Sequence, residues 1–132
     1  SQGSAILGAS GGGTGVHQHS CVVVQDRCFV AVGDRVAALA LPDLRLLWQV
    51  KADDATCFGL HVTPDDQHII VHGELAISRF TVDGQKEWEF SGKDIFTGAC
   101  ALHEGAVVVM DFLDEEYLID LELGHGKIVR LD

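Results

Sequence analysis

The segments Leu41-Pro-Asp-Leu-Arg-Leu-Leu-Trp48 and Val82-Asp-Gly-Gln-Lys-Glu-Trp88 each run from a turn into a tryptophan. Fifteen residues before each tryptophan stands a glycine that is followed by an acidic residue. A third segment, Leu121-Glu-Leu-Gly-His-Gly-Lys127, repeats the pattern without the tryptophan. These matches predict three repeats with a period of 40 or 41 residues, at about 15–58, 59–97 and 98–132, behind a glycine-rich segment 1–14.

Each repeat is expected to contain four short strands. β-Branched and aromatic residues fill the expected strands, and aspartate, glycine and proline separate them. The expected strands are 16–24, 28–32, 36–41 and 46–51 in the first repeat, 60–63, 68–72, 75–82 and 86–90 in the second, and 99–102, 106–110, 117–123 and 127–131 in the third. No segment has a sustained helical period, so the sequence predicts an all-β protein with little or no helix.

Four strands in every repeat of about 40 residues is typical of the blades of β-propellers. The segments that end at Trp48 and Trp88 resemble the blade endings of quinoprotein-type (PQQ-like) and WD-repeat-like propellers. The resemblance implies three four-stranded antiparallel blades. It does not imply PQQ itself, because no cofactor-binding motif matches residue by residue, and we expect no cofactor. It implies that Trp48 and Trp88, like Phe58 and Phe96, pack between blades.

Three blades are fewer than the four to eight that usually close a propeller. The sequence therefore favours a partial propeller that is completed by oligomerisation, with a dimer of six blades as the preferred form. Closure of three blades on themselves and a fragment of a longer protein are the alternatives. Segment 4–9 could form an extra strand that completes the last blade, in this chain or in a neighbouring one.

Composition excludes several classes of function. Nine basic and twenty acidic residues give a net charge of −11, which repels nucleic acid and anionic membranes. Apolar residues make up 47% of the chain, too many for a disordered protein, and no apolar run is long enough for a membrane helix. A partner is therefore expected to be a protein with a basic surface.

The four cysteines have neither the spacing of a zinc finger nor that of a redox motif. Cys21, Cys28, Cys57 and Cys100 lie in or beside apolar runs, which predicts buried free thiols in a reducing cytosol. The N-terminal residues lack the basic region of a signal peptide, so a cytoplasmic location is expected, although a removed signal peptide is compatible with the sequence.

Two histidines suggest a metal site. His17 and His19 are alternate residues of an expected strand, so both rings project to one side. His72, Glu74 or Asp94 could complete a site for zinc or another divalent ion near the propeller axis, with sensing or catalysis attached. The competing interpretation is that strand histidines pack in the interior and bond to the backbone.

The loops between blades and between the second and third strands are expected at one end of the propeller, and acidic residues dominate them. A general acid/base pair at this end, formed by Asp53 with Asp94 or by His72 with Glu74, is one hypothesis. The preferred hypothesis is a non-enzymatic platform for a protein partner, with these residues on the binding face: Asp34, Asp53, Asp54, Lys93, Asp114 and Glu115.

Overall fold

The structure, a computed structural model, describes residues 21–129 of the chain. These residues form twelve strands and no helix, and so they include no helix that could cross a membrane. The strands are β1 (Cys21–Val24), β2 (Arg27–Val32), β3 (Arg35–Ala40), β4 (Arg45–Lys51), β5 (Cys57–Val62), β6 (His68–Gly73), β7 (Ile77–Thr81), β8 (Lys86–Phe90), β9 (Cys100–His103), β10 (Ala106–Met110), β11 (Glu116–Asp120) and β12 (Gly126–Val129).

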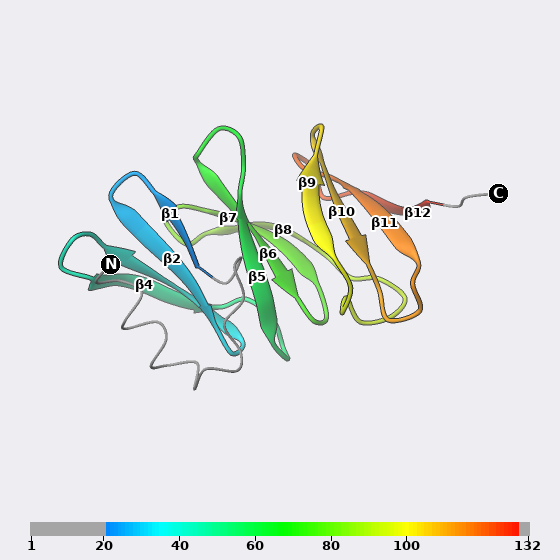
Figure 1. The fold of residues 1–132 in the computed structure, drawn as a ribbon, viewed down its shortest axis with the longest axis horizontal. Coiled ribbons are helices and arrows are strands. Elements are labelled where there is room, and N and C mark those ends of the chain that lie inside the picture. Colours follow the sequence, from blue (N-terminus) through cyan, green and yellow to red (C-terminus); the bar gives the residue numbers. More distant parts are fainter. Residues whose placement is uncertain (1–20, 130–132) are drawn as a thin grey trace.

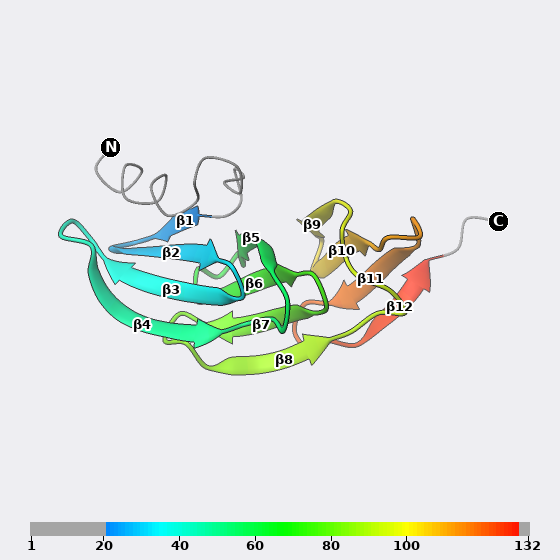
Figure 2. The same cartoon turned by 90° about the horizontal axis from the view of Figure 1, so that it is seen from below.

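The twelve strands make three antiparallel sheets of four strands, each with its strands in sequence order. The sheets lie side by side from β1 to β12 (Figure 1). Seen from the second direction, β1, β5 and β9 lie along one edge of the molecule, and β4, β8 and β12 lie along the opposite edge (Figure 2). The predicted fold class is confirmed, and each expected strand has a counterpart among the described residues. The strand expected at 117–123 ends at Asp120 because a turn follows it.

The core consists of two apolar layers, one between each pair of neighbouring sheets. Phe29, Ile69 and Phe80 belong to the layer between the first and second sheets. Ile70 and Tyr117 belong to the layer between the second and third. Adjacent residues Ile69 and Ile70 of β6 enter different layers because successive strand residues point to opposite faces. The middle sheet is therefore buried on both faces, whereas each terminal sheet has only one face against another sheet.

A repeated contact between a tryptophan and a glycine joins neighbouring sheets. The indole Nε1 of Trp48 in β4 donates to the Val82 carbonyl oxygen at 3.0 Å, and Trp88 Nε1 in β8 donates to the Leu121 oxygen at 3.1 Å. Each ring lies so close to a glycine of the next sheet, Gly84 or Gly124, that a side chain on that glycine would collide with it. We call this contact the tryptophan clamp.

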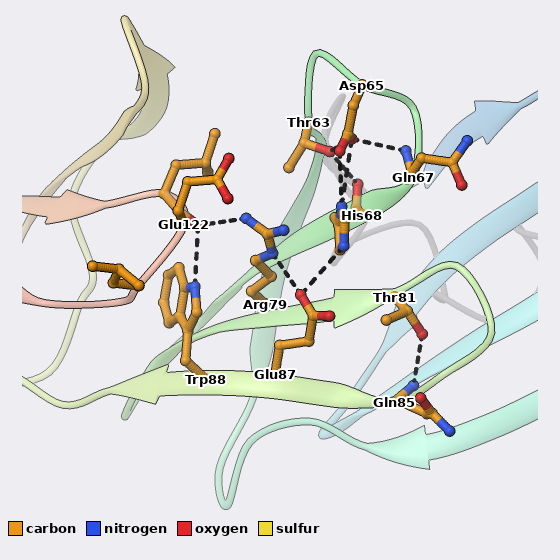
Figure 3. A network of polar contacts seen from close by, with 12 residues as sticks. Thr63, Asp65, Gln67, His68, Arg79, Thr81, Gln85, Glu87, Trp88 and Glu122 are labelled. Carbon is orange, nitrogen blue, oxygen red and sulfur yellow. Dashed lines mark hydrogen bonds and ion pairs between the residues drawn. The ribbon is translucent and has the colours of Figure 1, made fainter.

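Two arginines accompany the clamps. Arg27 Nη1 donates to the Val82 oxygen at 2.8 Å, and Arg79 Nη1 donates to the Leu121 oxygen at 2.7 Å. Arg79 is buried, and its Nε lies 2.8 Å from Glu87 (Figure 3). Trp88 and Arg79 thus bond to the same carbonyl group of the third sheet. The predicted role of Trp48 and Trp88 between sheets agrees with this geometry.

The clamp is lost at both ends of the array. The turn of each sheet that would receive a tryptophan contains one residue with positive φ: Leu44 (59°), Gly84 (93°) and Gly124 (75°). The first sheet therefore has leucine where the others have glycine. In the third sheet Lys127 lies opposite Leu118, at the register position of the tryptophans, and the strand irregularity beside each tryptophan is missing there.

Candidate functional site

The loops at one end of the sheets are joined by backbone hydrogen bonds. Ala52 N donates to Asp34 O at 2.8 Å, and Glu74 N donates to Thr56 O at 2.7 Å. Phe96 N donates to Glu74 O at 2.8 Å, and Phe112 N donates to Ile95 O at 2.7 Å. These bonds connect loops that include residues 33–34, 52–56, 74–76, 91–99 and 111–115, which we call the loop end. It contains every described residue that the sequence placed on a binding face.

Asp53, at the loop end, is 5% exposed and acts as a structural residue. Its carboxylate accepts hydrogen bonds from the backbone amides of Ala55 and Ala76 at 3.0 Å and from that of Leu75 at 3.2 Å. The amide of Leu75 lies 22 residues away in the chain, so Asp53 ties the first sheet's exit to the β6–β7 turn. The sequence placed Asp53 on the binding face, whereas its carboxylate lies inside the fold.

Asp111 has the same role in the third sheet, where it is 2% exposed. It accepts from the amides of Leu113 at 2.9 Å and Glu115 at 3.0 Å, and from the hydroxyl of Tyr117 at 3.0 Å. Burial, followed by the interaction with Asp111, raises the pKa of the Tyr117 hydroxyl, so it remains a donor. Asp111 thereby fixes the conformation of the β10–β11 loop.

The tip of that loop exposes two large apolar side chains that the sequence interpretation missed. Phe112 is 64% exposed and Leu113 is 60% exposed, although the loop beneath them is tightly bonded. The sequence feature that could have revealed them is a pair of large apolar residues in an aspartate-rich turn, where small or polar turn-forming residues are expected. We call Phe112 and Leu113 the apolar tip.

The loop end also carries carboxylates that are at least partly exposed. Asp54 and Asp114 are exposed, and Asp34 and Glu115 are half-buried. Local cations offset part of this charge, since Lys51 lies 3.3 Å from Asp54 and Lys93 lies 3.2 Å from Glu115. Such exposed pairs contribute little to stability.

His72, proposed as a metal ligand, is buried and bonded to the backbone. Its Nε2 lies 2.7 Å from the carbonyl oxygen of Phe96, and its ring packs edge-on against Phe58 at 5.4 Å. Burial lowers the pKa of His72, so the imidazole is neutral and donates to Phe96. The interpretation of His72 as a packed core histidine therefore fits the geometry.

The other proposed ligands do not assemble around His72. Asp94 Oδ1 accepts from the amide of Ile95 at 2.8 Å, and residues 21–129 contain no group of three side chains that could hold a metal ion. His17 and His19, segment 4–9 and most of the first expected strand lie outside the described residues. A site that uses the two N-terminal histidines stays a prediction.

A groove follows β1, β5 and β9, the first strand of each sheet, and we call it the inner groove. Its part beside the loop end has a volume of about 450 Å³ and is lined by Phe58, Gly59, His61, His72, Thr97, Gly98 and Cys100. The adjoining part, about 550 Å³, is lined by residues of β1, β5 and β9 that include Val22, Val23, Leu60 and Leu102. His61 and Cys100 line both parts of the groove.

Comparison with solved structures gives this architecture a name. The structure of the RRP9 WD40 repeats superimposes with a TM-score of 0.69 at 14% identity, and the β-propeller domain of Cps50 (Swd1) from Myceliophteria thermophila with 0.70 at 15%. The chain has a β-propeller fold. BamB from Moraxella catarrhalis, a PQQ-like propeller, matches with a TM-score of 0.69 at 12% identity.

The three sheets are therefore propeller blades, as the resemblance implied. The matches cover 83–87% of this chain but only 35–39% of the three propeller chains, so it spans well under half of their length. No protein-family model matches the sequence, and no curated protein matches it. At these identities the likeness establishes the fold alone.

Proposed function

We propose that this three-bladed chain is a non-enzymatic protein-interaction module that binds its partner at the loop end. The WD40 neighbours support the general role, because propellers of that type typically serve as platforms for proteins. The observation that carries the site is the apolar tip, two exposed large side chains on a loop that the buried Asp111 holds in place.

A rigid apolar tip favours association for two physical reasons. Phe112 and Leu113 lose apolar surface to a partner, which is favourable in proportion to the area removed from water. Because the loop is already ordered by Asp111, binding costs little additional conformational entropy. Apolar anchors that are surrounded by polar groups are typical of interaction hot spots.

Charge at the loop end favours a basic partner. The exposed carboxylates of Asp54 and Asp114 lie at this end, in a chain with a net charge of −11. A partner with lysines or arginines around an apolar pocket matches both features. Opposite charges accelerate association, and added salt screens them.

Peptide display tests this proposal without knowledge of the partner. A random peptide library is selected against the immobilised protein, and the affinities of the enriched peptides are then measured. We expect enrichment of lysine and arginine beside large apolar residues, and a large loss of affinity in the variant Phe112→Ser with Leu113→Ser. The matched control is Leu123→Ser, which is 64% exposed in the β11–β12 turn at the opposite end. Unbiased peptides, or equal losses in both variants, would refute the site.

Among the described residues, each terminal sheet has only one face against another sheet, and this supports a second element of the proposal, a dimer. Two copies joined head to tail would give six blades, within the usual range for closed propellers. The outer face of the first sheet exposes Val23 (60%) and Leu46 (57%), which a neighbouring blade would cover. The outer face of the third sheet carries Val108 and Leu118.

The missing clamps fit a contact between the two terminal sheets. Such a contact would bring Lys127, which is at the tryptophan position, to the turn 41–44, where leucine stands in place of glycine. The exposed Asp43 of that turn supplies an opposite charge to Lys127. The third sheet lacks the tryptophan and the first sheet lacks the glycine. The tryptophan clamp therefore cannot form between these two sheets, and their contact must be of another kind. Native mass spectrometry of the untagged protein measures the assembly, and a monomer at all concentrations would contradict the dimer.

A further inference from the structure

Two of the four cysteines are in contact. Cys21 of β1 and Cys28 of β2 have their Sγ atoms 3.4 Å apart and share a weak hydrogen bond. In the register, Cys21 lies opposite Val30, and Cys28 lies opposite Val23. The two cysteines are therefore diagonal neighbours on one face of the sheet.

That face is turned away from the second sheet. Val22 and Phe29, which alternate with the two cysteines along β1 and β2, pack into the layer between the first and second sheets. Because alternate residues of a strand point to opposite sides, the thiols lie on the outer face of the first sheet. The remaining cysteines, Cys57 and Cys100, lie elsewhere on β5 and β9.

The two thiols of the pair differ in accessibility. Cys21 is half-buried, whereas Cys28 is 3% exposed. Burial and the hydrogen bond to Cys21 raise the pKa of the Cys28 thiol to about 12. Burial likewise raises the pKa values of Cys57 and Cys100 to about 12, and neither thiol contacts another cysteine among the described residues. While no second copy covers this outer face, Cys21 is thus the thiol that an external reagent can reach, and the Cys28 thiol lies beside it.

We propose that Cys21 and Cys28 form a redox-active dithiol that a small disulfide such as oxidised glutathione converts to a disulfide. In the first step the Cys21 thiolate attacks one sulfur of oxidised glutathione, forms a mixed disulfide and releases one glutathione thiolate. In the second step the Cys28 thiol loses its proton and attacks the Cys21 sulfur, and the second glutathione leaves. Two protein thiols are oxidised, and one oxidised glutathione is reduced to two thiols.

The position of β1 at the edge of its sheet allows the disulfide to form. The sulfurs must approach from 3.4 Å to about 2.05 Å, which requires rotation of both side chains and a small movement of one strand. β1 is the terminal strand of its sheet and pairs with β2 over four residues, so it is the strand that can move. The second step is expected to be slow, because little of the buried Cys28 is thiolate at neutral pH.

Formation of the disulfide would restrain β1, which forms one side of the inner groove. Val22 and Val23 of β1 line that groove together with residues of β5 and β9. A covalent link from β1 to β2 would hold this side of the groove in a single position. The dithiol therefore couples the redox state of the surroundings to the inner edge of the first blade, independently of the partner site at the loop end.

The full chain, incubated in glutathione redox buffers, tests the proposal. Free thiols are then alkylated under denaturing conditions, and each cysteine is followed by peptide mass spectrometry. We expect Cys21 and Cys28 to become linked within one chain while Cys57 and Cys100 remain alkylatable, and the oxidised protein to melt at a higher temperature. Complete alkylation of both Cys21 and Cys28 after oxidation, in protein that retains its far-UV circular dichroism, would overturn the proposal.

Single variants separate the two roles. Cys28→Ser should stop at a mixed disulfide of glutathione with Cys21, whereas Cys21→Ser should leave Cys28 unmodified. Cys57→Ser is the matched control and should close the disulfide as the natural chain does. Phenylarsine oxide, which bridges adjacent thiols, supplies a measurement on the unaltered chain and should protect both cysteines from alkylation. Failure of that protection, or an unmodified Cys21 in the Cys28→Ser variant, would contradict the assignment.

Discussion

Gly124→Ala tests whether the tryptophan clamp holds neighbouring blades together. Gly124 has a φ of 75°, and a β-carbon placed there would overlap the indole ring of Trp88. Gly105 in the same sheet is the matched control, since its φ is 80° and a β-carbon would meet no atom within 4 Å. Both substitutions place alanine in a left-handed conformation, and only Gly124→Ala disturbs the clamp.

The magnitudes follow from these contacts. The left-handed conformation costs an L-residue about 1–2 kcal/mol, which applies to both variants. Gly124→Ala adds about 1–3 kcal/mol for overpacking against Trp88. It also weakens the hydrogen bond from Trp88 to the Leu121 oxygen, which contributes about 1 kcal/mol. We therefore expect Gly124→Ala to lower the free energy of unfolding by about 2–4 kcal/mol more than Gly105→Ala does.

Urea unfolding followed by far-UV circular dichroism measures this difference without relying on the fluorescence of the perturbed tryptophan. The same denaturant slope in both variants would show that their unfolded and folded states remain comparable. Equal losses of stability in Gly124→Ala and Gly105→Ala would refute the clamp as a source of cohesion between blades.

Three further predictions concern ionisable side chains. Arg79→Ala removes the ion pair with Glu87, which keeps its contact with His68, and also removes a bond to the third blade, so thermal unfolding should show a loss of about 1.5–3 kcal/mol, and Arg79→Lys a smaller one. Because burial lowers the pKa of His72 below its ordinary 6.5, the unfolded chain alone takes up this proton as the pH falls below 6.5. His72 should therefore contribute full stability above that pH and reduce it by up to about 1.4 kcal/mol per pH unit below it, a dependence that His72→Gln should lack in urea titrations at several pH values. Lys127→Glu should weaken the dimer in native mass spectrometry, and Asp43→Lys in the same chain should restore it; no restoration would reject this charge pair.

The fold could be predicted because its determinants are local in sequence. Trp48 and Trp88 recur with their turns at a fixed spacing, and each strand is a short run of β-branched and aromatic residues between turn residues. Blade architecture follows from such a repeat, since each unit must bury its apolar faces against a neighbouring unit.

The roles of single residues at the loop end could not be predicted in the same way. An aspartate in a turn is usually exposed, and nothing near Asp53 in sequence reveals that amides 22 residues away surround its carboxylate. His72 was interpreted as a ligand that could complete a metal site with His17 and His19, yet its bond is to the backbone of Phe96. Both outcomes depend on contacts between blades, which the repeat pattern does not encode.

The double-sided burial of the middle sheet has a consequence for the cooperativity of unfolding. In a linear array of repeats, stability is approximately a sum of the units and of the contacts between nearest neighbours. The middle blade has two such contacts and each terminal blade has one, so amides of β6 and β7 are expected to exchange their hydrogens most slowly. Within one chain the terminal blades can open without the centre, and substitutions of Ile69 and Ile70, adjacent residues of one strand, weaken different interfaces.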